Sequence, residues 1–76
     1  KLPLTISIDS TEYDKIQDLE KMLNSTDLVS NFYILKFNNK NTYYKIIYNG
    51  SPKTFFSDIN KRGLDLIIVN NIWTIK

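Results

Sequence analysis

The sequence contains neither cysteine nor histidine, and these two absences exclude several classes of chemistry. Without cysteine the chain forms no disulfide, no thiolate metal site and no thiol nucleophile. Without histidine it has no His-based triad, no His metal site and no His general base. Carboxylates and hydroxyls are the remaining metal ligands and nucleophiles. A chain without cysteine is compatible with reducing and oxidising compartments alike.

Long apolar runs and a strong net charge are also absent. The run from Leu66 to Val69 is as long as any in the chain, far short of the roughly 18 residues of a membrane span. Ten basic and eight acidic residues leave a net charge of +2, too small to indicate nucleic acid binding. With 42% hydrophobic and 24% charged residues, residues 1–76 are expected to form a single globular domain. The first residue, Lys1, is not methionine and no signal peptide follows, which indicates a piece excised from a longer protein.

One pattern of elements occurs twice along the chain. A strand-like segment ending at Asp9 is followed by a helix-like run to Leu23 and a β-rich segment ending at Phe37. The second half repeats this order, with a shorter helix-like run ending at Arg62 and a terminal segment through Trp73. Two strand–helix–strand units joined by a hairpin predict an α+β fold, a ferredoxin-like βαββαβ sandwich. We expect a four-stranded antiparallel sheet with both helices on one face.

Local signals predict the ends of the elements in the first half. Apolar and polar residues alternate from Leu2 to Ile8, as in a half-buried strand. Asp9 as N-cap with Glu12 three residues later predicts a helix that begins at Ser10. Polar residues 24–27 end this helix, and a strand from Leu28 or Phe32 to Phe37 follows. The apolar face of the helix is expected to comprise Tyr13, Ile16, Leu19, Met22 and Leu23.

The second half is punctuated by turn and cap residues. Residues 38–41 have turn composition, so the second and third strands (42–48) are expected to form an antiparallel hairpin. Ser51 as cap and Pro52 at the first helical position predict a helix to Arg62, ended by Gly63. The last segment is either one strand or two short strands folded at Asn70 and Asn71, and we favour a small hairpin or a bulge there. The predicted core comprises Ile16, Leu19, Leu35, Ile46 or Ile47, Phe55, Phe56 and Ile59.

The remaining candidates for chemistry have simpler structural explanations. Asp14 and Asp18 are four residues apart on a helix, but two exposed carboxylates are far from the six or more oxygens that calcium takes. Asp9 is better explained as a cap than as a catalyst. The loop before Pro52 could offer N–H groups to a phosphate, but it lacks the further glycines of a nucleotide loop. We therefore predict no enzyme activity and no catalytic, cofactor-binding or metal-binding residue.

Aromatic and basic residues gather on the second and third strands. Because side chains alternate, Tyr44, Ile46 and Tyr48 share one face and Tyr43, Lys45 and Ile47 the other. Such a sheet is a plausible docking surface, which favours a noncatalytic protein-interaction or structural module. The partner is expected to be another protein, another domain of the same chain or a second copy. The candidate surface comprises Tyr33, Lys36, Tyr43, Tyr44, Lys45 and Tyr48.

Two alternative ligands stay open for this surface. Aromatic rings among lysines on a sheet can stack the bases of single-stranded RNA. RNA-recognition modules, however, carry aromatics on the first and third strands and a glycine-containing core on the third. Here the first strand has no aromatic residue and the third lacks the glycine. Tyrosine faces also suit sugar rings, so a peptidoglycan or glycan ligand is the other alternative. The glutamine-bearing first strand that is typical of peptidoglycan-binding envelope modules is missing.

The C-terminal residues carry a resemblance to a known group of proteins. Tyr44 to Gly50, then Phe55 or Phe56, Gly63-Leu64 and Ile72 to Ile75 are similar to the closing segment of an uncharacterised family of proteobacterial envelope proteins. The similarity covers about the last thirty residues, and Asn71-Ile72 stands where that family has a glycine before the tryptophan. The resemblance implies a noncatalytic module in the periplasm or cell envelope, with no known active residues.

Overall fold

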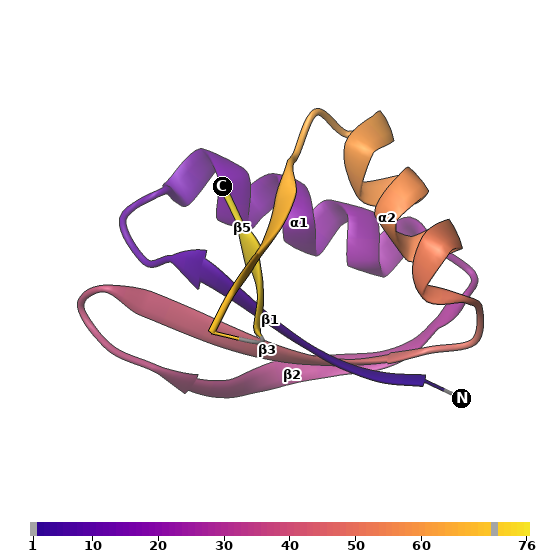
Figure 1. Cartoon of the computed structure of the whole chain (residues 1–76), viewed down its shortest axis with the longest axis horizontal. Coiled ribbons are helices and arrows are strands. Elements are labelled where there is room, and N and C mark those ends of the chain that lie inside the picture. Colours follow the sequence, from indigo (N-terminus) through magenta and orange to yellow (C-terminus); the bar gives the residue numbers. More distant parts are fainter. Residues whose placement is uncertain (1, 71) are drawn as a thin grey trace.

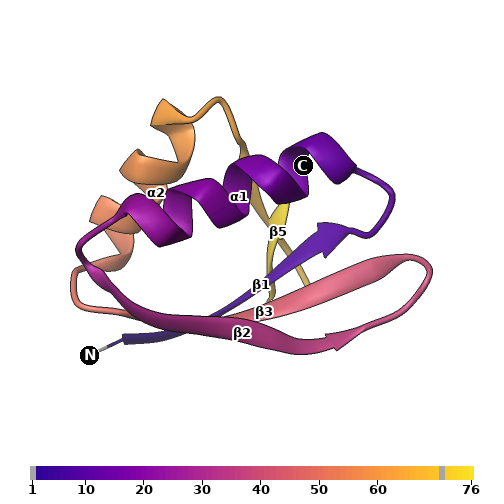
Figure 2. The same cartoon turned by 180° about the vertical axis from the view of Figure 1, so that it is seen from behind.

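The computed structural model describes residues 2–70 and 72–76 and shows an α+β fold, as the sequence predicts (Figures 1 and 2). Helices α1 and α2 both lie on one face of a mixed five-stranded sheet. The elements in chain order are β1 (Leu2–Asp9), α1 (Tyr13–Ser25), β2 (Val29–Phe37), β3 (Asn41–Tyr48), α2 (Pro52–Lys61), β4 (Leu66–Val69) and β5 (Ile72–Ile75).

The strand order is β2-β3-β1-β5-β4, which corrects the predicted sheet. Strand β1 pairs antiparallel with β3 and parallel with β5, while β4 pairs antiparallel with β5 at the far edge. The expected four-stranded antiparallel sheet is therefore wrong, and the ferredoxin-like order is not confirmed. The terminal hairpin that we favoured is present, and its turn residue Asn70 has φ 52°. Asn71 lies outside the described residues.

The predicted capping box at the start of α1 is wrong. The backbone N–H and the hydroxyl of Thr11 both donate to Asp9 Oδ1, at 2.8 and 2.7 Å, and these bonds hold the pKa of Asp9 below its usual value. Asp9 is still part of β1, so its carboxylate closes a short turn rather than capping the helix. Helix α1 begins at Tyr13 with Glu12 as N-cap and without a side-chain cap bond. Tyr13 is 72% exposed and does not belong to the apolar face.

Both ends of α2 are built as the sequence predicts. The N–H of Thr54 donates to the Ser51 hydroxyl at 3.2 Å, and Pro52 occupies the first turn. At the other end Gly63 has φ 79°, a conformation that costs glycine little. Gly63 N–H donates to the carbonyl of Asn60, and Leu64 N–H to that of Ile59. These two bonds form a Schellman cap, which ends the helix at Lys61, one residue before the predicted end.

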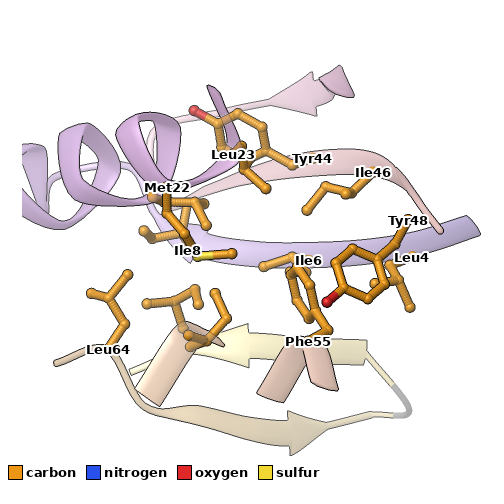
Figure 3. Close-up of a cluster of buried hydrophobic side chains, with 13 residues drawn as sticks. Leu4, Ile6, Ile8, Met22, Leu23, Tyr44, Ile46, Tyr48, Phe55 and Leu64 are labelled. Carbon is orange, nitrogen blue, oxygen red and sulfur yellow. The ribbon is translucent and has the colours of Figure 1, made fainter. Parts of the chain in front are cut away.

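The core lies between the helices and the covered face of the sheet (Figure 3). Leu19, Ile46, Phe55 and Ile59 are buried as predicted, while Ile16, Ile47 and Phe56 are half-buried. Leu35 is 51% exposed, so its assignment to the core is wrong. It lies at a register shift between Ile34 and Lys36 on the edge strand β2. The central strand β1 contributes Leu4, Ile6 and Ile8 to this core.

Phe55 is the aromatic centre of this core and gives the first prediction. Its ring meets Tyr48 edge-on at 5.1 Å and stacks on Trp73 at 6.4 Å, and the residue is 0% exposed. Phe55→Ala is expected to lower the free energy of unfolding by about 3–5 kcal/mol. The matched variant Phe56→Ala should lower the free energy of unfolding clearly less, because Phe56 is only half-buried beside Trp73. Urea denaturation measures both, and equal losses would contradict this packing.

Candidate interaction surface

The face of the sheet opposite the helices is uncovered (Figures 1 and 2). This face is termed the open face. Toward the β2 edge of this face, β3 contributes Tyr43, Lys45 and Ile47, and β2 contributes Tyr33 and Lys36. The described chain thus exposes a sheet surface that no element of its own covers.

Alternation along β3 creates the difference between the two faces. Thr42, Tyr44, Ile46 and Tyr48 are all buried, whereas the residues between them are half-buried. Successive side chains of a strand point to opposite faces, and the helices cover only one of these faces. A single strand therefore supplies both the core and the exposed surface.

A β-bulge in β2 places Lys36 on the open face. Tyr33 pairs with Lys45 and Ile34 pairs with Tyr44. The next residue of β3, Tyr43, pairs with Lys36 and not with Leu35. Leu35 is thus the extra residue, and a bulge of this kind changes the phase of the strand. Without it, strict alternation from Tyr33 would put Lys36 on the covered face. The bulge therefore explains both the exposure of Leu35 and the position of Lys36.

The open face is aromatic and positively charged where β2 pairs with β3. Lys36 Nζ lies 4.9 Å from the centroid of the Tyr43 ring, within the range of a cation–π contact. Lys45 lies beside Tyr33, which is 48% exposed. Within the described residues neither lysine forms an ion pair. Thr5, the neighbour of Lys45 on β1, is uncharged, so the positive charge of this cluster is not compensated.

Two of the predicted surface residues lie on the covered face instead. Tyr44 is 1% exposed and Tyr48 is 0% exposed, so their assignment to the interaction surface is wrong. The same alternation that puts Tyr43 and Lys45 on the open face turns both of these rings into the core. The structure thus groups Tyr33, Lys36, Tyr43 and Lys45, and it separates Tyr44 and Tyr48 from them.

The two buried tyrosines connect the sheet to the helices. The Tyr44 hydroxyl donates to Glu20 Oε2 on α1 at 2.5 Å, and the Tyr48 hydroxyl donates to Asp58 Oδ2 on α2 at 3.2 Å. Burial, followed by the bond to Glu20 and its charge, raises the pKa of Tyr44 well above its usual value. Burial and the charge of Asp58 raise the pKa of Tyr48 in the same way. Both hydroxyls therefore stay protonated at neutral pH.

A hollow of about 180 Å³ lies on the open face, over the central strand β1 and its neighbours. It adjoins Tyr43 and is formed where the β4–β5 hairpin meets β1 and β3. Ser7 at its base is 5% exposed and lies within 3.5 Å of Asn41 Oδ1. No local pattern in the sequence predicts this hollow, because it depends on the parallel pairing of β5 with β1. Its lining consists of Ser7, Asn41, Tyr43, Val69, Asn70, Ile72 and Thr74.

The other predicted candidates for chemistry keep their structural roles. Asp14 and Asp18 are exposed on α1, and Ser51 caps α2. Among residues 2–70 and 72–76 no three carboxylates are close enough together to hold a metal ion. Neither described helix is long and apolar enough to cross a membrane.

The comparisons with known proteins leave the family open. No protein-family model matches the chain, and neither a curated protein nor a solved structure matches it. The resemblance of the C-terminal residues to an envelope protein family stays a prediction.

The raised pKa values predict a loss of stability in alkali. Below pH 10 each hydroxyl is protonated in the folded and the unfolded chain, so their contribution to stability is constant. Above pH 10.0, the ordinary tyrosine value, the unfolded chain ionises first and the free energy of unfolding falls. In Tyr44→Phe this fall should be smaller.

The measurement compares urea midpoints at about pH 9 and about pH 11.5. The matched control is Tyr33→Phe, which removes a hydroxyl from the exposed face and should keep the pH dependence of the original chain. An equal fall in Tyr44→Phe and in the original chain would contradict the role of the Tyr44–Glu20 contact.

Proposed function

We propose that this chain is a noncatalytic module that binds another protein, or another domain of a longer protein, through the open face. One observation supports this most: the rings of Tyr33 and Tyr43 lie uncovered beside Lys36 and Lys45. Interface centres are enriched in tyrosine and other aromatic residues, which bury a large area at low entropic cost. An uncovered sheet face that presents aromatic rings beside lysines fits this use.

The uncompensated lysines specify the chemistry of the partner. Lys36 and Lys45 form no ion pair among the described residues, and the residues that pair with them across the strands are uncharged. A partner surface that combines apolar groups with carboxylates would pair with this face. We therefore expect an acidic protein surface on the open face.

A photo-crosslinker tests this proposal in cells that express the chain. With benzoylphenylalanine in place of Tyr33, irradiation should give a discrete adduct with a protein, identified by mass spectrometry. The double variant Lys36→Glu and Lys45→Glu should lose most of this adduct, because the charge of the open face is reversed.

The matched control carries the same crosslinker in place of Tyr13, which is more exposed, at 72%, and lies on α1. No corresponding adduct is expected there. Adducts of equal strength from both positions, or an adduct at position 33 that survives the charge reversal, would contradict docking on the open face. An adduct with RNA alone would replace the protein partner by the nucleic acid alternative.

The hollow beside Tyr43 favours a second candidate function, the binding of a neutral sugar. Its polar lining consists of hydroxyl and amide side chains without a charged group, and such groups hydrogen-bond to sugar hydroxyls. The Tyr43 ring supplies an apolar wall. The lining of this hollow offers no opposite charge to a charged ligand. A neutral glycan does not require one.

An amide NMR titration with a chitooligosaccharide tests this second candidate. Shifts confined to the amides of Ser7, Tyr43 and Thr74, and abolished in Tyr43→Ala, would support it. Tyr33→Ala is the control, because Tyr33 does not line the hollow. An unchanged spectrum at millimolar sugar would count against glycan binding.

We also infer a relationship of the fold to the ferredoxin-like sandwich. Strand β4 is antiparallel to β5, and β5 is parallel to β1, so β4 runs antiparallel to β1. If β5 were removed and β4 moved beside β1, the order would be β2-β3-β1-β4, that of the predicted sandwich. In this interpretation β5 is an added strand between β1 and β4.

A further inference from the structure

Strand β4 has the sequence of an interior strand but lies at the edge of the sheet. Leu66, Ile67, Ile68 and Val69 are apolar at successive positions, a pattern typical of strands that are buried on both faces. In the structure β4 pairs only with β5. Ile67 is 41% exposed, Ile68 65% and Val69 44%. A single copy of the chain therefore does not cover the side chains of this strand.

The backbone of β4 also presents free hydrogen-bonding groups in a regular order. The N–H of Lys76 donates to the carbonyl of Asp65 at 2.9 Å, so Asp65 directs its backbone groups toward β5. Because these directions alternate along a strand, Ile67 also faces β5, and Leu66 and Ile68 face the free edge. The edge can accept one more strand.

The two edges of the sheet differ in how they are protected. The pairing of β2 has register shifts between Val29 and Asn31 and between Ile34 and Lys36, and bulges of this kind hinder a further strand from pairing. The pairing of β4 has no shift, and β4 contains neither a charged residue nor proline. Natural edge strands usually carry at least one of these protections.

We propose that β4 pairs antiparallel with β4 of a second copy of this chain, on a two-fold axis that passes Ile67. In this register Leu66 lies opposite Ile68 of the second copy, and Ile67 lies opposite its own equivalent. The outward backbone groups of Leu66 and Ile68 then pair on both sides of the axis. An axis at Ile68 would instead bring Leu66 opposite Asn70, which has left the strand at φ 52°.

Self-complementarity and closure identify a second copy as the occupant. The pairing places Asp65 opposite Val69, so no like charges meet across the strands. The two-fold contact pairs the unprotected β4 edges of both copies with each other. Only the bulged β2 edges then stay free, so the assembly stops at two copies. Pairing of β4 with β2 of another copy would continue into an open chain and would meet the bulges.

A cysteine series tests the register, because the chain has no other thiol. Ile67 and its equivalent would form a non-hydrogen-bonded pair with Cα atoms about 4.5 Å apart, within disulfide range. Ile67→Cys should therefore oxidise to a covalent dimer at least about tenfold faster than either control, a margin that corresponds to about 1.4 kcal/mol.

Two controls match this variant. Ile68→Cys is on the same strand and more exposed, but its partner would be Leu66. Ile34→Cys is 49% exposed on the other edge strand, β2. Equal rates for all three variants would overturn the proposal, as would faster crosslinking through Ile34→Cys.

Sedimentation equilibrium of the unmodified chain gives an independent readout. The average mass should rise with concentration from 8.9 kDa toward twice that value. Ile67→Lys should raise the dissociation constant of the dimer at least about tenfold, because two lysines would face each other. A monomer at every concentration up to about 1 mM would overturn the proposal. If Ile67→Lys does not fold, as judged by circular dichroism, the crosslinking rates of the cysteine variants and the mass of the unmodified chain test the proposal instead.

This inference is independent of docking on the open face. The variant with Lys36→Glu and Lys45→Glu changes no residue of β4 and should dimerise with the dissociation constant of the original chain. Failure of the photo-crosslinking experiment would therefore contradict docking on the open face but not the pairing of β4 strands. A chain that stays monomeric would contradict the pairing of β4 strands but not docking on the open face.

Discussion

The one-sided cover of the sheet is the constraint on which the rest of this structure depends. Both helices lie against the same face, so every second residue of β1 and β3 enters the core and the residues between them do not. Strand β3 shows this most completely, with four buried side chains that alternate with half-buried ones. A one-residue slip of its register would exchange the two sets and expose the core. Core stability and the chemistry of the open face are therefore fixed by the same register.

The buried tyrosines show how this register is tied to the helices. Tyr44 reaches Glu20 of α1, and Tyr48 reaches Asp58 of α2, so each helix has one polar contact with the same strand. Each ring fills the core while its hydroxyl meets a carboxylate, which avoids the cost of an unpaired buried hydroxyl. The row of rings continues from Tyr48 through Phe55 to Trp73 and thereby joins β3, α2 and β5. Aromatic packing thus spans the sheet from β3 to β5.

Features that depend on neighbouring residues could be predicted from the sequence. Ser51, Pro52 and Gly63 mark the ends of α2, and turn residues 38–41 mark the hairpin, because caps and turns are satisfied within a few residues. Asp9 shows the limit of such signals, because Thr11 competes with the helix for its carboxylate. A capping motif identifies a donor and an acceptor but not which of two local turns they form.

Long-range features could not be predicted in the same way. The residues within and around β4 and β5 do not specify which of the two strands lies beside β1. The more uniformly apolar β4 has the pattern of an inner strand. The structure places β5 there, where Trp73 packs on Phe55 and Phe56 and where Ile75 is 3% exposed. The alternation on β3 was visible in the sequence, but which face the helices cover was not. Tyr44 and Tyr48 were therefore assigned to the surface together with Tyr43 and Lys45.

The geometry of a self-paired β4 edge would also change what the open face offers. A two-fold axis between antiparallel edge strands is perpendicular to the sheet, so both pairs of helices would lie on one side and both open faces on the other. The clusters of lysine and tyrosine on β2 and β3 of the two copies would then lie toward the two ends of one continuous ten-stranded surface. A partner with two acidic sites could engage both clusters, and the second contact would benefit from the high effective concentration of an intramolecular event. Weak docking on each open face could then give firm binding without any further contact within one copy.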